Sequence, residues 1–193
     1  MKKNIFLTIL SIFFFTFLIT NDSFSIERKE KNTFDKKEIV DKAKIYFADL
    51  SEGVSIIIER SFNDFGKPSA YIEGDEFSAA FFGGIRYGGG KIYFKDGTNK
   101  EIYWNGPSLG FDLGANASKV FTLIYNLESE NIKKIYDRYP DAEGTLFLVA
   151  GLAINYQQKD DIIITPVRSG IGLRIGVNLG YTKYTKKKSL IPF

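Results

Sequence analysis

Apolar residues recur with a helical period in two segments near the start of the chain. From 39 to 50 they form one stripe, and Asp35 followed by Glu38 has the form of a capping box. A second stripe runs from 54 to 65 and is followed by Gly66, a residue type that commonly ends helices. The pattern predicts two amphipathic helices, each with one face to bury.

From residue 70 the period of apolar residues changes to two, which is typical of strands with one buried face. Asp96-Gly97 predicts a hairpin with a type I′ turn, because both residue types tolerate positive φ angles. Gly88-Gly89-Gly90 is predicted to break a strand, and Asn105-Gly106-Pro107 to turn the chain. Strands are expected over 77–87, 91–95, 99–104, 108–114, 120–126, 145–156, 162–165 and 167–184.

One further helix is predicted within this series of strands, beginning at Ser129 and ending at Pro140. Strands and helices do not alternate regularly, which disfavours a parallel α/β core. The sequence therefore predicts a mainly β protein. The expected architecture is a small soluble antiparallel β-barrel, closed or strongly curled, with two N-terminal helices and one inserted helix.

The first residues have the features of a secretory signal peptide. Lys2 and Lys3 precede an apolar run at 5–20, which is shorter than the roughly 20 residues that a membrane-spanning helix needs. Ser23 and Ser25 fit the small-residue positions of a cleavage site, so cleavage is predicted after Ser25, with an uncleaved membrane anchor as the alternative. The predicted organisation is a signal peptide at 1–25, a flexible charged leader at 26–34 and a single domain at 35–193.

The composition narrows the chemistry, because the chain contains neither His nor Cys. Nucleophiles activated by His, zinc sites built from Cys and His, disulfides and the thioether anchor of a lipoprotein are all excluded. The net charge of +3 gives no support for nucleic acid as a partner. We expect an exported protein that is not an enzyme, binds no cofactor or metal, and has no transmembrane span after signal cleavage.

Two predicted strands carry small residues on one face and apolar residues on the other. Each small-residue face includes one charged residue, Asp112 on the first and Arg174 on the second. One hypothesis is that Asp112 and Arg174 pair on a tightly packed face where glycine supplies the room, and the alternative is that both face solvent. The small-residue faces consist of Ser108, Gly110, Asp112 and Gly114, and of Gly170, Gly172, Arg174, Gly176, Asn178 and Gly180.

The charged groups give little support for catalysis. In the pairs Asp75-Glu76 and Asp160-Asp161 the neighbouring side chains of an extended chain point to opposite faces, so neither pair converges on a substrate or a metal. A carboxylate-based hydrolase of envelope glycan is therefore the least favoured hypothesis. Lys186, Lys187 and Lys188 form a basic run that is either a solvated tail or a contact to anionic lipid. This run, the preceding helices and Pro192 disfavour a membrane β-barrel.

Four motifs carry a resemblance to a known family. They are WNGPSLGFD at 104–112, ASKVFTLIYNL at 117–127, PVRSGIGLR at 166–174 and IPF at 191–193. Over about 35–193 the chain closely resembles the EipA-type envelope proteins. The resemblance implies a small soluble β-barrel in the periplasm of a Gram-negative bacterium that helps to maintain cell-envelope integrity. The resemblance brings no catalytic residue. Trp104, Lys119 and Arg168 lie within these motifs and, with Asp112 and Arg174, are candidate structural or ligand-lining residues.

A fainter similarity is to SYLF lipid-binding domains, on the Trp104 to Ser108 turn and the strand at 120–127. The basic helix that such domains use for acidic lipids is not evident near the N-terminus. The favoured function is an exported, non-enzymatic protein that supports envelope integrity by binding an envelope lipid, glycan or assembly protein. The alternative is a lipid-surface binding domain that engages anionic lipid through strand aromatics and Lys186, Lys187 and Lys188.

Overall fold

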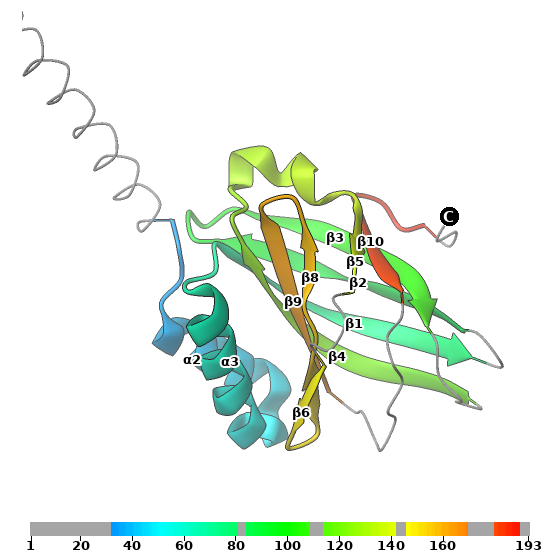
Figure 1. Cartoon of the computed structure of the whole chain (residues 1–193), viewed down its shortest axis with the longest axis horizontal. Coiled ribbons are helices and arrows are strands. Elements are labelled where there is room, and N and C mark those ends of the chain that lie inside the picture. Colours follow the sequence, from blue (N-terminus) through cyan, green and yellow to red (C-terminus); the bar gives the residue numbers. More distant parts are fainter. Residues whose placement is uncertain (1–31, 81–83, 109–113, 142–145, 170–179, 190–193) are drawn as a thin grey trace, which may run out of the picture. The chain divides into compact units, whose positions relative to one another are not determined.

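The computed structural model describes residues 32–80, 84–108, 114–141, 146–169 and 180–189. By its internal contacts the chain divides into two units, Met1–Thr33 and Phe34–Phe193. All the helices and strands of the described residues belong to the second unit (Figure 1). The predicted pair Asp112 and Arg174 lies outside the described residues, so its pairing stays a prediction.

Two helices come first, α2 over Lys36–Phe47 and α3 over Ser51–Phe65, joined by a 3-10 turn at Ala48–Leu50. The predicted stripe of α2 is confirmed, because Ile39, Ala43 and Phe47 are buried. The predicted capping box is not formed. The Asp35 side chain caps no backbone N–H of the helix and instead lies 3.0 Å from Lys67 Nζ, so an ion pair replaces the cap.

The strands form one antiparallel sheet in the order β5-β10-β3-β2-β1-β4-β9-β7-β6, with β8 also paired to β9. An isolated bridge between Asp141 and Gln157 joins the end of β5 to β8. Because β8 pairs with β9, this bridge closes a ring of strands, and the sheet is a small barrel at that point. The strands are β1 (Ala70–Ala80), β2 (Gly84–Phe94), β3 (Asn99–Ser108), β4 (Gly114–Tyr125), β5 (Arg138–Pro140), β6 (Phe147–Val149), β7 (Leu152–Ile154), β8 (Gln157–Lys159), β9 (Ile162–Ser169) and β10 (Tyr181–Thr185).

Alternate residues of the same strands build two separate hydrophobic cores. Inward-facing side chains such as Ile72, Ile92 and Ile124 form a core inside the curled sheet. Outward-facing neighbours such as Tyr71 and Phe121 form a second core against α2 and α3. The two helices therefore cover the outer face of one part of the barrel, which Figure 1 shows beside β4 and β9.

Glycine and proline positions correct two sequence predictions. Gly88-Gly89-Gly90 does not break a strand but lies within β2, paired with β1 on one side and β3 on the other. Asn105-Gly106-Pro107 does not turn the chain and lies within β3. In both places pairing with neighbouring strands outweighs the weak local preference of these residues for turns. Gly88-Gly89-Gly90 and Asn105 are paired on two sides, and Gly106 and Pro107 are paired with β2.

The hairpin at Asp96-Gly97 is confirmed, but its turn type is not. Gly97 N donates to Phe94 O and Phe94 N donates to Thr98 O, and of the two turn residues only Gly97 has a positive φ, at 87°. This arrangement is a type I turn followed by a left-handed glycine, one of the common alternatives to the two-residue type I′ loop.

The inserted helix is shorter than predicted. A 3-10 helix, η2, spans Ser129–Ile135, and Arg138–Pro140 forms β5. Tyr139 explains the difference, because its ring is buried inside the barrel and packs edge-on against Tyr184. Burying this large aromatic ring stabilises an extended chain here more than a further helical turn would.

Candidate binding site in the barrel interior

The inward-facing side chains change from apolar to polar along the barrel. On β1, Ile72 belongs to the inner hydrophobic core, whereas Glu76, four residues later on the same face, is 5% exposed and charged. Charged and amide side chains from other strands join Glu76 at this level. We call this group the interior polar cluster; it consists of Glu76, Arg86, Asp141, Asn155, Gln157, Arg168, Thr182 and Tyr184.

A two-pronged ion pair joins β1 to β9 inside the barrel. Arg168 Nε lies 2.9 Å from Glu76 Oε1, and Arg168 Nη2 lies 3.4 Å from Glu76 Oε2. Trp104 Nε1 donates to Glu76 Oε2 at 2.8 Å, and Arg168 Nη1 donates to Asn155 Oδ1 at 2.8 Å. Both charged side chains are less than a tenth exposed, so the attraction acts with little screening by water.

A second, looser pair lies beside the first. Arg86 Nη2 is 3.7 Å from Asp141 Oδ2, and both side chains are at most 5% exposed. Asp141 Oδ1 accepts hydrogen bonds from Asn155 Nδ2 and Gln157 Nε2, each at 2.7 Å. Asp141 Oδ2, by contrast, accepts no hydrogen bond from the part of the chain that the structure describes. One buried carboxylate oxygen of the cluster therefore has unused hydrogen-bonding capacity.

Thr182 and Tyr184 complete the cluster from β10. The Thr182 hydroxyl accepts from Arg86 Nη2 at 3.2 Å and from Gln157 Nε2 at 2.7 Å. Tyr184 donates its hydroxyl proton to Gln157 Oε1 at 3.2 Å. Residues far apart in the sequence thus converge because the closing bridge brings β5 and β8 to the same point as β10.

The ionisation of the cluster follows from its two arginines. Burial would raise the pKa of the Glu76 carboxyl, but Arg168 and Arg86, with hydrogen bonds from Arg168 and Trp104, hold that pKa below its ordinary value. Burial would lower the pKa of Arg168, and Glu76 keeps it above its ordinary value. Both groups are therefore charged at neutral pH. Burial raises the pKa of the Tyr184 hydroxyl, which stays protonated and can donate.

Glycines on β1 and β2 make room for the indole ring of Trp104. A Cβ atom on Gly88 would lie 2.0 Å from Trp104 Cε2, and one on Gly74 would lie 2.9 Å from Trp104 Cη2. Only residues without a side chain therefore fit beside the ring. The ring is 4% exposed and reaches Glu76 across this space.

The predicted site residues divide between the interior and the surface. Trp104 and Arg168 lie inside the barrel and hydrogen-bond the same carboxylate. Lys119 lies on the outer face, where its Nζ donates to Tyr46 O at 3.0 Å. Lys186, Lys187 and Lys188 are exposed after β10, and their contact to lipid stays a prediction.

Sequence reasoning did not single out Glu76 or its partners Arg86, Asp141, Asn155 and Gln157. The opposite orientation of Asp75 and Glu76 is as expected, since Asp75 is exposed and Glu76 is buried. A signal was available in the alternation, because Glu76 falls on the same strand face as Ala70 and Ile72. A charged residue on an otherwise apolar strand face is expected to have a buried partner of opposite charge, but the pattern does not show which residue that partner is.

The described residues bear on metal binding and on membrane spanning only through their own geometry and hydropathy. No group of three or more Asp or Glu side chains there is arranged to hold a metal ion. Among the same residues, no helix has the length and apolar character needed to cross a bilayer.

The sequence matches the family model of Envelope integrity protein A, EipA, over residues 32–193. The chain belongs to the EipA family. It is also similar to a solved structure described as a beta-barrel-like, uncharacterized protein from Brucella abortus, with 38% identity and a TM-score of 0.74. That match covers 83% of this chain and 99% of the other. A search of curated proteins gave no match.

These comparisons confirm two predictions made from the sequence. The resemblance to EipA proteins is a family membership, and the mainly β barrel is shared with the Brucella abortus protein. The name of the EipA family points to a role in envelope integrity. It names no ligand, and the similarity to SYLF domains stays a prediction.

Proposed function

We propose that this EipA protein is exported to the periplasm by a signal peptide that is then cleaved, and that it supports envelope integrity by binding an envelope component at the interior polar cluster. The name of the family supports the proposed role in envelope integrity. The binding role rests on one observation, the concentration of charged and amide side chains inside one part of a small barrel. Barrels of this size hold either packed side chains or one small ligand.

The unused acceptor Asp141 Oδ2 indicates the kind of group that would bind. This oxygen is buried 3.7 Å from Arg86 Nη2, and a ligand hydroxyl or amide N–H could donate a hydrogen bond to it. Trp104 and Tyr184 supply aromatic surface nearby, with ring centroids 6.4 Å apart. A polyhydroxylated or amide-bearing envelope molecule, such as a glycan, suits these groups.

The same electrostatics argue against a hydrolase. A general acid for glycan hydrolysis needs a carboxyl with a raised pKa, whereas the arginines lower the pKa of Glu76. An ionised carboxylate held by two arginine nitrogens is a poor proton donor at neutral pH. We therefore propose a binding protein without catalytic residues.

Complementation of a deletion strain tests this function. The strain is exposed to detergent and to a cell-wall inhibitor, and the gene is supplied as wild type, as Asp141→Asn or as Asp161→Asn. Asp141→Asn replaces the buried carboxylate with an amide, whereas Asp161→Asn makes the same change at an exposed residue between β8 and β9. We expect wild type and Asp161→Asn to restore resistance and Asp141→Asn to restore it poorly.

Two measurements make the result interpretable. Immunoblotting establishes equal protein levels, and thermal unfolding followed by the fluorescence of Trp104, the chain's single tryptophan, shows that Asp141→Asn is folded. Native mass spectrometry of the protein purified from its own cells then looks for a bound glycan or lipid. Normal resistance in the deletion strain would count against the envelope role, and full complementation by folded Asp141→Asn would count against the binding site.

A lipid-surface role is the second candidate function, since Lys186, Lys187 and Lys188 are exposed. It involves the outer face of the barrel and not the interior polar cluster.

A further inference from the structure

One row of outward-facing residues crosses the part of the barrel that the helices leave uncovered. Phe77 pairs with Tyr87, Tyr87 with Asn105, Asn105 with Lys183, and Lys183 with Arg138. Paired residues of antiparallel strands project to the same face. Their neighbours Glu76, Arg86, Trp104 and Thr182 point into the barrel, so this row points outward.

Phe77 is the exposed apolar residue of this row. Its side chain is 61% exposed, whereas the outward-facing Tyr71 earlier on β1 is 4% exposed beneath the helices. On the other side Phe77 pairs with Ala117, a small residue that leaves the ring uncovered. An exposed aromatic ring beside clustered cations suits a contact surface where the ring leaves water and the charges stay at its edge.

The C-terminal lysines belong to the same face. Asn105 Nδ2 donates to Ser189 O at 3.0 Å, and Thr185 Oγ1 donates to Lys187 O at 2.9 Å. These bonds fold the segment after β10 back over the outer side of β3. Asn105 is two strands from Phe77, about 10 Å at the usual strand spacing. The lysines are therefore anchored near the aromatic ring and are not a free tail.

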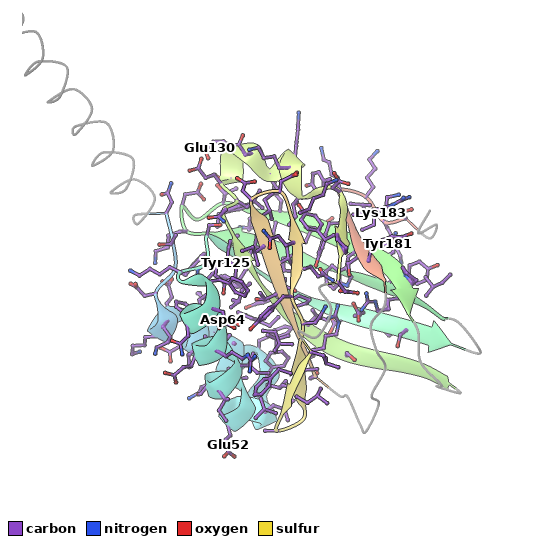
Figure 2. The ribbon with its side chains drawn as sticks, in the orientation of Figure 1. Glu52, Asp64, Tyr125, Glu130, Tyr181 and Lys183 are labelled. Atoms are coloured by element: carbon purple, nitrogen blue, oxygen red, sulfur yellow. The ribbon has the colours of Figure 1, made fainter. Side chains whose placement is uncertain are left out.

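The charges of this face have one sign along the row. Lys183 and Arg138 lie on the row itself, Figure 2 shows Lys183 on β10, away from α2 and α3, and Lys186, Lys187 and Lys188 are exposed beside it. The Arg138 guanidinium lies over the ring of Tyr181, 5.2 Å from its centroid. Among the described residues no carboxylate lies on this row. Acids beside the row have partners of their own: Asp137 is ion-paired to Lys159, and Asp75 pairs in register with Lys119. Glu101, on the outer face of β3, accepts a hydrogen bond from the Tyr103 hydroxyl at 3.0 Å.

We propose that this face, made of Phe77, Tyr87, Arg138, Lys183 and Lys186 to Lys188, docks on a bilayer surface that carries anionic phospholipid. Phe77 enters the boundary between headgroups and acyl chains, and the cations contact lipid phosphates. The charge complementarity selects an anionic surface over a neutral glycan. This proposal does not depend on ligand binding inside the barrel, and either can fail alone.

Vesicle sedimentation with the exported, processed protein tests the proposal. Its N-terminus is first checked by mass spectrometry, so that residual signal sequence is not mistaken for membrane binding. Vesicles contain either zwitterionic phospholipid alone or the same lipid with about a third phosphatidylglycerol, at low and at high salt. We expect binding to the anionic vesicles that weakens with salt, because the surface potential is screened within a Debye length.

Matched variants locate the contact. Each lysine near an anionic surface contributes about 1 kcal/mol, so Lys187→Gln with Lys188→Gln should weaken binding roughly 30-fold. Lys133→Gln with Lys134→Gln removes two exposed lysines of η2 and should change little. Phe77→Ser should weaken binding about tenfold or more, whereas Ile56→Ser on α3, where the side chain is 45% exposed, should not.

Three outcomes would overturn the proposal. They are absence of binding to anionic vesicles, equal binding to zwitterionic vesicles, and equal losses from the face variants and their controls. Circular dichroism shows whether each of the four variants is folded, and the exposed positions of all six substitutions make retention of the fold the expected result. Complementation of the deletion strain by Asp141→Asn, measured separately, reports on the interior site.

Discussion

Replacing Arg168 with methionine should strongly destabilise this protein. The substitution keeps much of the side-chain volume but leaves the buried Glu76 carboxyl without its two-pronged partner. Asn155 Oδ1 also loses the hydrogen bond that Arg168 donates. Removing one member of a buried ion pair typically costs about 3–5 kcal/mol. For a domain of this size each kcal/mol lowers the melting temperature by about 2–4 °C, so we expect a fall of roughly 6–20 °C.

Urea unfolding followed by Trp104 fluorescence measures this loss, because the indole ring contacts Glu76 directly. The control is Lys37→Met, which breaks an exposed pair with Asp41 whose side chains are 88% and 54% exposed. Such a pair within a helix contributes about 0.3–0.5 kcal/mol, so the control should stay close to wild type. In the double variant Glu76→Met with Arg168→Met, removal of the stranded charge should recover part of the loss.

The pH dependence gives a second check on the same pair. The folded-state pKa of Glu76 lies below its unfolded value, so the pair contributes stability above the unfolded pKa of about 4.3. That contribution disappears as the pH falls through the folded-state pKa. The difference in unfolding free energy between wild type and Arg168→Met should therefore be largest at neutral pH and shrink below about pH 4. A loss under 1 kcal/mol at pH 7, or one independent of pH, would refute the reasoning.

Three further predictions concern local geometry and processing. Gly88→Ala should lower the free energy of unfolding in urea by about 1–3 kcal/mol, because its Cβ would overlap Trp104. A decrease no larger than that of Gly89→Ala would contradict this account. Gly97→Ala should cost about 1–2 kcal/mol through its φ of 87° although nothing lies within 4 Å, and an unchanged unfolding midpoint would be inconsistent with backbone strain. Mass spectrometry of the exported protein should find an N-terminus at Ile26, and a chain that retains Met1 would exclude cleavage after Ser25.

Elements with a strong local period could be predicted from the sequence. The stripe of α2 and the end of α3 at Gly66 follow from side-chain spacing and from the left-handed backbone that glycine tolerates, here with φ at 77°. The alternation of period two likewise indicated a β-rich barrel. Weak local signals gave wrong predictions. Gly88 was predicted to break a strand, but it lies within β2, where it leaves space for the Trp104 ring.

Sequence alone therefore determined the class of this protein, the absence of His and Cys chemistry, and the family, because composition, period and motifs are local properties of the chain. Only the tertiary structure decided which residues form the interior polar cluster and which form the outward-facing row. Glu76 and Arg168 are 92 positions apart, and Asn105 and Ser189 are 84 apart. Which buried charge meets which partner, and which lysines lie near Phe77, depends on strand pairing and on closure of the sheet. These long-range contacts leave no periodic trace along the chain.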